Sequence, residues 1–207
     1  MAKSRDAAEQ LARLVSDVRR DIIFGAYASG TWLKLTDLQS QHGAGASHIR
    51  RALDELKNEK LVDHVANAGF RVATLDVTAR AETLFVRIVL ERSAAYLITA
   101  RAQPADIVEL RRLAQVFEDS IGSEGRRAQA LANHDFHSYL YSLSGNAVLS
   151  ETIRELRNRS GQFTAGRWRS IEGLKASSRD HFTIIDAIEK RDPYEAEQAV
   201  VDHIRAF

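Results

Sequence analysis

The scarcity of chain-breaking residues is the feature that most constrains this fold. The 207 residues include only two prolines and 11 glycines, and these are the residue types that most strongly interrupt helices. Apolar residues make up 44% of the chain, which is enough to build packed cores. A mostly α-helical protein is therefore expected, and its length has room for two small domains.

The chain contains no cysteine, which excludes disulfides and thiolate metal sites. Any metal must therefore be bound by histidine, carboxylate or amide groups. No apolar run is long enough to span a membrane, and the first residues, MAKSRDAAEQ, lack a hydrophobic signal core. We therefore expect a cytoplasmic protein with no membrane partner.

Charge is divided unevenly along the chain. Residues 1–74 carry 11 Lys and Arg against 9 Asp and Glu, whereas residues 75–207 carry 18 against 19. The small positive excess in residues 1–74 has the sign expected for an N-terminal segment that binds nucleic acid. It is too small to establish that function alone.

Residues 1–74 show the element order of a winged helix-turn-helix domain. The predicted elements are an amphipathic helix at 6–24, a short helix from a Thr36 cap to His42, a helix capped by Ser47, and a hairpin formed by LVDHV and FRVATL. In such a domain the third helix enters the major groove by its N-terminal end. Arg50 and Arg51, near that end, suit bases or phosphates. On charge alone, a solvated helix face explains the two arginines equally well.

The stretch from DIIFGAYASG to ANAGFRV resembles the DNA-binding domain of GntR-type transcription regulators. The resemblance includes Gly30, Gly43, Arg50 and Gly69 in the family's order. It implies double-stranded DNA as a partner, contacted by Thr36, Ser47, His48, Arg50, Arg51 and Gly69.

This chain departs from the family's pattern at several positions in the DNA-binding segment. Ser29 and His48 stand where family members often have proline. Thr36 and Ala46 stand where family members commonly have arginine. Arg50 therefore carries most of the expected base recognition. Three alternatives stay open: His48 and Arg51 compensate, the operator is unusual, or DNA binding is weak.

Residues 75–207 show no strand alternation and are predicted to form an antiparallel all-helical bundle. About six helices are expected, at 78–102, 104–121, 125–143, 147–166, 176–190 and 193–206. Asp192 is predicted to cap the last helix, with Pro193 in its first turn and Glu195 completing a capping box.

Three histidines on three of these helices fall on predicted inward faces. They are His137, His181 and His203, and Asn133 precedes His137 by one helical turn. One hypothesis is a divalent metal site formed by these four residues, and such a donor set suits Zn, Ni, Fe(II) or Mn. The alternative is that each histidine is an ordinary core residue with a hydrogen-bond partner. His134 and Asp135 are expected to face away from this site.

The blocks LFVRIVLERSAAYLI, NHDFHSYLYSLSGN and RDHFTIIDAIEKRDPYEAEQAVVDHI resemble the FCD ligand-binding domain of FadR-like GntR regulators. The resemblance implies that Asn133, His137, His181 and His203 surround one metal, with Asn133 in place of the commoner aspartate. It also implies a small organic acid as effector, bound at open metal positions.

Arg87 matches an arginine that commonly faces the effector cavity in this family. A guanidinium is well shaped for a carboxylate, but an ion pair with Glu91 one turn later is an equal alternative. Arg154 and Arg157 are weaker candidates for the same role.

The sequence thus predicts a homodimeric DNA-binding transcription regulator with two domains, 1–74 and 75–207. We expect a repressor controlled by a small carboxylate at a metal site, with no catalytic residues. Two alternatives stay open at this point: a metalloenzyme that uses the three histidines, and a regulator that senses the metal itself.

Overall fold

A computed structural model describes residues 2–24, 26–74, 77–122, 125–161 and 170–206. The chain divides into two compact units, residues 1–75 and 76–207. Each unit is described by itself.

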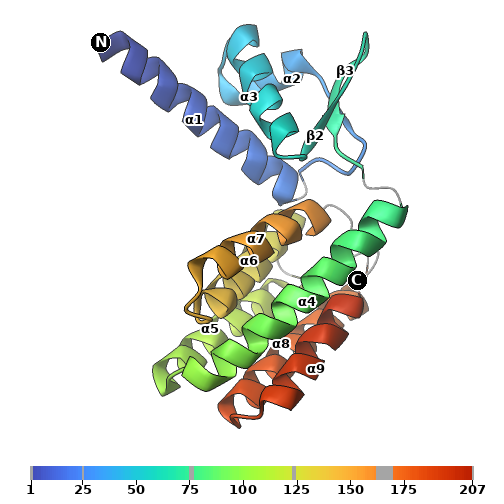
Figure 1. Ribbon diagram of the computed structural model, residues 1–207. Coiled ribbons are helices and arrows are strands. Elements are labelled where there is room, and N and C mark those ends of the chain that lie inside the picture. The colour runs from blue at the N-terminus through green and yellow to red at the C-terminus, as the bar shows by residue number, and fades with distance from the viewer. Residues whose placement is uncertain (1, 25, 75–76, 123–124, 162–169, 207) are drawn as a thin grey trace. The chain divides into compact units, whose positions relative to one another are not determined.

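The first unit is a winged helix-turn-helix with a small antiparallel sheet (Figure 1). Its elements are α1 (Ala2–Ile23), β1 (Trp32–Leu33), α2 (Leu35–His42), α3 (Ala46–Asn58), β2 (Val62–Val65) and β3 (Gly69–Val72). The sheet has the order β1-β3-β2. The predicted hairpin is confirmed, but β1 was not predicted because two residues are too few to show alternation.

The core of this unit forms where α1 packs against α3. Residues spaced three and four apart on each helix are buried there: Leu11, Leu14, Val15, Val18, Ile22, Ile49, Ala52, Leu53 and Leu56. This packing uses one face of α3 and leaves its opposite face in solvent.

Both predicted helix caps in this unit are wrong by two residues. Helix α2 follows Lys34 and helix α3 follows Gly45, and neither residue makes a side-chain cap. Thr36 and Ser47 are each the second residue of their helix. Lys34 and Gly45 have the extended backbone of an N-cap residue, so each helix begins at the next residue, before Thr36 or Ser47.

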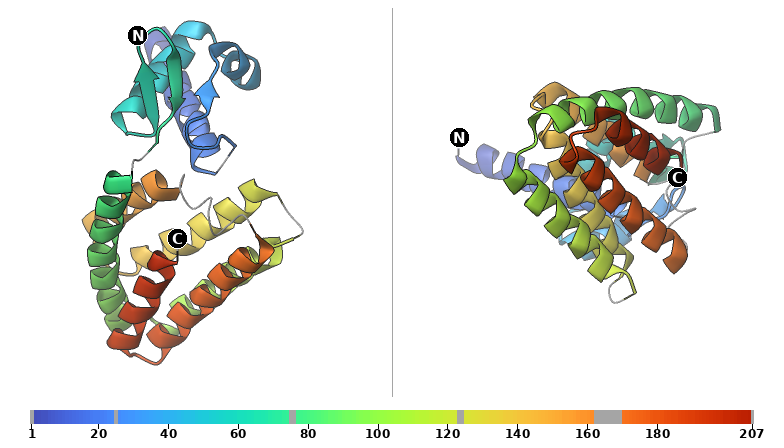
Figure 2. Two further views of the ribbon diagram at one scale, coloured as in Figure 1. Left: turned by 90° about the vertical axis from the view of Figure 1, so that its right-hand side faces the viewer. Right: turned by 90° about the horizontal axis from the view of Figure 1, so that it is seen from below.

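The second unit contains six helices in the part that the structure describes, as predicted. They are α4 (Val77–Arg101), α5 (Pro104–Ser120), α6 (Arg126–Ser142), α7 (Ala147–Gly161), α8 (Ile171–Glu189) and α9 (Pro193–Arg205). Helix α4 packs against α7 and α9, α5 packs against α6 and α8, and α8 packs against α9. Figures 1 and 2 show this bundle of side-by-side helices.

The ends of these helices test the predicted boundaries. The Asp192 carboxylate accepts a hydrogen bond from the Glu195 amide, so the predicted cap is confirmed, but the Glu195 carboxylate pairs with Lys190. Helix α8 begins at Ile171 rather than 176, because the Ser170 side chain caps it through the Gly173 amide. The predicted end of the fourth helix, at 166, lies outside the described residues.

No helix among the described residues combines the length and the apolar character needed to cross a membrane.

Candidate functional site

Three histidines meet inside the second unit. His137 comes from α6, His181 from α8 and His203 from α9, and each is at most 1% exposed. One ring nitrogen from each lies within 4.8 Å of the other two. The structure therefore brings together the three histidines that the sequence pointed to, from segments up to 66 residues apart.

Aromatic rings pack against these histidines. Phe136 stacks on the His181 ring with centroids 4.1 Å apart, and Phe117 approaches the same ring at 5.0 Å. The His137 and His203 rings are stacked at 5.1 Å. Each histidine belongs to the buried stripe of its helix, so the core packing that forms the bundle also assembles the cluster.

Burial favours the neutral form of two of the histidines, His137 and His203. Burial lowers the pKa of His137 well below its usual value, and the positive charge of Arg157 acts in the same direction. Burial also lowers the pKa of His203, although Asp180 acts in the opposite direction. A neutral imidazole is the form that binds a metal ion.

The spacing of two of the ring nitrogens fits a shared metal ion. His137 Nε2 and His203 Nε2 are 3.2 Å apart, and two nitrogens bound about 2.0–2.1 Å from one metal would be about 3.0–3.4 Å apart. Asn133 Oδ1, one turn before His137, is buried and has no hydrogen-bond partner among the described residues. A buried carbonyl oxygen without a partner is costly, and a bound cation is one partner that would satisfy it.

Beside the cluster lies a buried ionic network around Glu91. Arg87 donates to Glu91 at 2.7 Å, Arg157 donates at 3.3 Å, and the Tyr141 hydroxyl donates to the same carboxylate. Burial alone would raise the pKa of Glu91, but Arg87 and Arg157 lower it overall. Of the two roles considered for Arg87, effector binding or an ion pair with Glu91, the structure shows the ion pair.

An open cavity of about 420 Å³ lies between α6 and α7. Its lining residues are His134, His137, Ser138, Tyr141, Ser142, Gly145, Asn146, Ala147, Ser150, Glu151, Arg154, Arg157 and Asn158. His137 is thus part of both the histidine cluster and the cavity wall. Arg154 and Arg157 add positive charge to the wall, and Arg154 is paired with Glu151.

Sequence reasoning misjudged two residues near the site. His134 lines the cavity instead of facing away, because residues three apart on a helix lie on nearly the same side. Asp180 was overlooked, although its Oδ2 atom is 3.2 Å from His203 Nδ1. The available signal was a carboxylate next in sequence to a candidate metal ligand.

The predicted DNA-binding residues lie on one helix-turn-helix and its wing. Thr36 on α2 is exposed, as are Ser47, Arg50 and Arg51 near the start of α3, whereas His48 is half-buried. Neither Arg50 nor Arg51 forms an ion pair with another described residue. Gly69 begins β3 with a φ of 103°, a left-handed value that favours glycine.

Two families match nearly the whole chain. The family described as "Bacterial regulatory proteins, gntR family" matches residues 10–72, and the FCD domain family matches residues 82–206. Each match falls within one of the two compact units.

Similar proteins are transcription regulators. The Nta operon transcriptional regulator of Aminobacter aminovorans is 26% identical over 179 residues, covering 86% of this chain and 83% of the relative. The HTH-type transcriptional repressor GlaR of Escherichia coli K12 is 25% identical over 195 residues, covering 90% and 89%. The solved structure of E. coli McbR/YncC, at 19% identity, shares the fold with a TM-score of 0.82 over 95% of this chain and 93% of that chain.

The resemblance stated from the sequence is confirmed. The chain belongs to the gntR family of bacterial regulatory proteins that carry an FCD domain, and it is a DNA-binding transcription regulator rather than an enzyme.

Proposed function

We propose that this regulator is a repressor released from its operator by a small carboxylate anion. The anion enters the cavity between α6 and α7 and reaches a divalent metal bound by Asn133, His137, His181 and His203. The observation that carries the proposal is the double position of His137, in the histidine cluster and in the cavity wall. The relative GlaR is itself named a repressor.

The metal would act as a Lewis acid that binds the anion at an open coordination position. The donor set suits Zn, Ni, Fe(II) or Mn. Asn133 is a neutral ligand, so the bound cation keeps more of its charge for an anionic effector than an aspartate would allow.

Arginines in the cavity supply the rest of the anion's binding energy. Arg154 and Arg157 both line the cavity, and a guanidinium can bind a carboxylate through two parallel hydrogen bonds. Arg157 already donates to Glu91, so a ligand carboxylate would compete with Glu91 for it. Arg87 is held by Glu91 and acts by orienting that carboxylate.

Effector binding changes DNA affinity only if the effector binds the two states of the protein differently. The test is a titration of metal-loaded protein on an operator fragment with a panel of small carboxylates, followed by fluorescence anisotropy. A carboxylate that releases DNA from the wild type is expected to act at higher concentration on Arg154→Ala. Arg112→Ala is the matched control, because Arg112 forms the same type of pair, with Glu109 three residues before it, on α5.

Two outcomes would contradict parts of this proposal. If no carboxylate changes DNA affinity at saturation, the effector mechanism fails but DNA binding stands. If DNA affinity follows metal concentration alone, the regulator senses the metal itself.

We also propose that the regulator is a homodimer that reads two half-sites. Helix α4 supports this, because one of its faces exposes a stripe of large apolar side chains: Phe85, Val86, Val89 and Tyr96, which are 43–68% exposed. A second copy of this chain would cover them. Sedimentation of wild type and Val89→Glu would test this proposal. We expect a dimeric wild type and a weakened dimer in Val89→Glu, and a monomeric wild type would contradict the proposal.

A further inference from the structure

A carboxylate outside the proposed ligand set contacts one of its histidines. Asp180 Oδ2 lies 3.2 Å from His203 Nδ1, where His203 is 1% exposed and the Asp180 side chain is 30% exposed. Asp180 is on α8, directly before His181, and His203 is on α9. The contact therefore ties together two helices that each carry a histidine of the cluster.

The chemistry of this contact favours one tautomer of His203. An ionised carboxylate can only accept a hydrogen bond, so beside an ionised Asp180 the His203 Nδ1 atom would carry the proton and donate it. In a neutral imidazole the other nitrogen then keeps its lone pair. That nitrogen, Nε2, is the atom 3.2 Å from His137 Nε2, so the lone pair of His203 faces the centre of the cluster.

His137 lacks a comparable partner. Its Nδ1 atom is buried and has no hydrogen-bond partner among the described residues. No hydrogen bond at Nδ1 therefore fixes the tautomer of His137, which can change when a cation replaces the proton between the two rings. On His203, by contrast, the contact with Asp180 favours the tautomer that can bind a metal through Nε2.

We propose that Asp180 is a positioning residue that holds His203 as the Nδ1–H tautomer and aims its Nε2 lone pair at the metal centre. The inference rests on the proposed function for its consequence in metal binding, but the proposed tautomer does not require a metal. Carboxylates behind metal-bound histidines typically contribute 10–100-fold to metal affinity, so removing Asp180 should weaken binding about 10–100-fold.

The test uses the full-length protein in two forms. In the metal-free form, nitrogen-15 NMR of the histidine rings reports the tautomer of His203. In a second measurement, competition with a chromophoric chelator gives the dissociation constant for Zn²⁺. The variants are Asp180→Ala, which removes the acceptor, and Asp180→Asn, which restores an acceptor oxygen without the charge.

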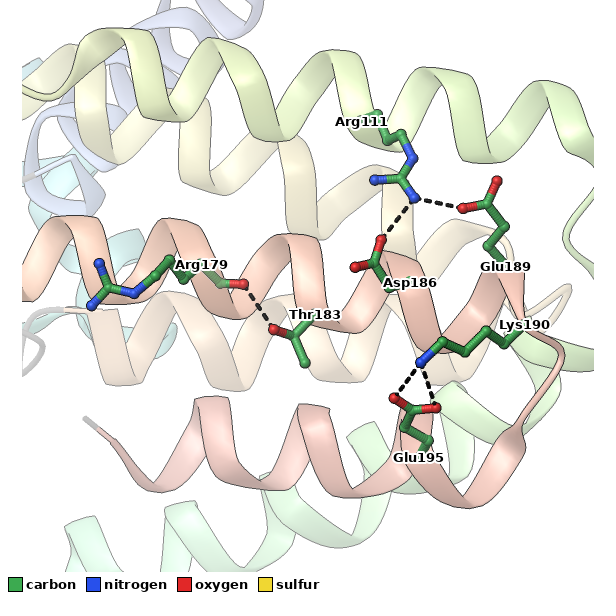
Figure 3. Close-up of polar contacts among 7 residues, drawn as sticks. All are labelled: Arg111, Arg179, Thr183, Asp186, Glu189, Lys190 and Glu195. Carbon is green, nitrogen blue, oxygen red and sulfur yellow. Dashed lines mark hydrogen bonds and ion pairs between the residues drawn. The ribbon is translucent and has the colours of Figure 1, made fainter.

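Asp186→Ala is the matched control. Asp186 is on the same helix but pairs at 2.7 Å with Arg111 on α5, in a surface cluster that also includes Glu189 (Figure 3). Circular dichroism of each metal-free variant checks that the helices are intact.

The expected result is an Nδ1–H tautomer for His203 in the wild type and in Asp186→Ala. In Asp180→Ala the Nε2–H form should appear and Zn²⁺ affinity should fall about 10–100-fold, with Asp180→Asn in between. An unchanged tautomer in Asp180→Ala, or Zn²⁺ affinity equal to that of Asp186→Ala, would overturn the proposal. Wild-type protein that binds no Zn²⁺ would overturn the metal function, while the tautomer result would still decide the orienting role of Asp180.

Discussion

His137 and His203 face each other through their Nε2 atoms, 3.2 Å apart, from helices that are distant in sequence. Two nitrogen lone pairs at this distance repel each other unless a proton or a cation lies between them. In the metal-free protein one ring must supply that proton, and a metal ion would displace it. Metal binding at this centre would therefore be coupled to a tautomer change of that ring and to the stability of the bundle.

The first prediction concerns this coupling. Adding Zn²⁺ or Ni²⁺ should raise the free energy of unfolding, by about 2.7 kcal/mol when free metal is 100 times its dissociation constant. Chelator treatment should reverse the gain, and His137→Ala should abolish it. Chemical denaturation with and without metal measures the effect. His64→Ala, which removes an exposed histidine from β2, should keep the gain, and a gain that persists in His137→Ala would place the metal elsewhere.

The second prediction concerns the amide ligand. Asn133→Asp should bind divalent metal at least about tenfold more tightly, equivalent to 1.4 kcal/mol, because a carboxylate replaces a neutral oxygen at the same position. The same change should weaken carboxylate binding, because the metal centre becomes less positive. Isothermal titration measures both. Asn158→Asp, which alters a cavity residue outside the proposed ligand set, should not raise metal affinity, and equal gains from both variants would argue against ligation by Asn133.

Patterns along the chain predicted most of the fold because apolar spacing determines which helix faces are buried. His181 follows that rule, since the Ile184, Ile185 and Ile188 stripe placed it inward and the structure buries it. Helix starts were less predictable, because backbone conformation at Gly45 and Lys34 decided them rather than the hydroxyls nearby.

The contacts around the site could not be predicted, because they join segments far apart in sequence. The bond between Asp180 and His203 spans 23 residues, and the ion pair between Glu91 and Arg157 spans 66. Periodicity places a side chain on a face of its helix but does not say which residue of a neighbouring helix it meets. The cavity could not be predicted for the same reason, because its shape depends on how α6 packs against α7.

The third prediction concerns DNA recognition by α3. Arg50→Ala should cost about 1–3 kcal/mol of operator binding and relax specificity at one base position, if Arg50 contacts a base edge. Arg51→Ala should weaken binding to all sequences alike and reduce the slope of log affinity against log salt by about 1, if Arg51 contacts a phosphate. Anisotropy titrations at several salt concentrations separate the two effects.

The control for this prediction lies on the same helix. Lys57 is exposed in the last turn of α3 and lies 3.8 Å from Asp54, so Lys57→Ala changes charge away from the N-terminal end that we expect to enter the groove. It should leave operator specificity unchanged. If Lys57→Ala and Arg50→Ala had equal effects, general electrostatics rather than this end of the helix would explain DNA binding.

The last prediction concerns the buried network around Glu91. Glu91→Gln keeps the size of the side chain but leaves Arg87 and Arg157 buried without their counter-charge, which should destabilise the protein by about 3–5 kcal/mol. Glu109→Gln, which changes an exposed carboxylate paired with Arg112, should have little effect. Denaturant unfolding at neutral pH measures both variants. A Glu91→Gln protein as stable as the wild type would show that the network contributes no net stability.

The difference in stability between wild type and Glu91→Gln should depend on pH. In the folded protein the pKa of Glu91 is lowered from its ordinary value of 4.5. The folded state therefore binds a proton less readily than the unfolded state, so the ionised carboxylate stabilises the fold above pH 4.5. That stabilisation is lost as the pH falls through the lower, folded-state pKa. The stability gap between wild type and Glu91→Gln should thus stay constant above about pH 5 and narrow in more acidic solution. A gap that widened on acidification would mean that Glu91 is protonated in the folded protein, and Arg157 would then be available to a ligand without competition.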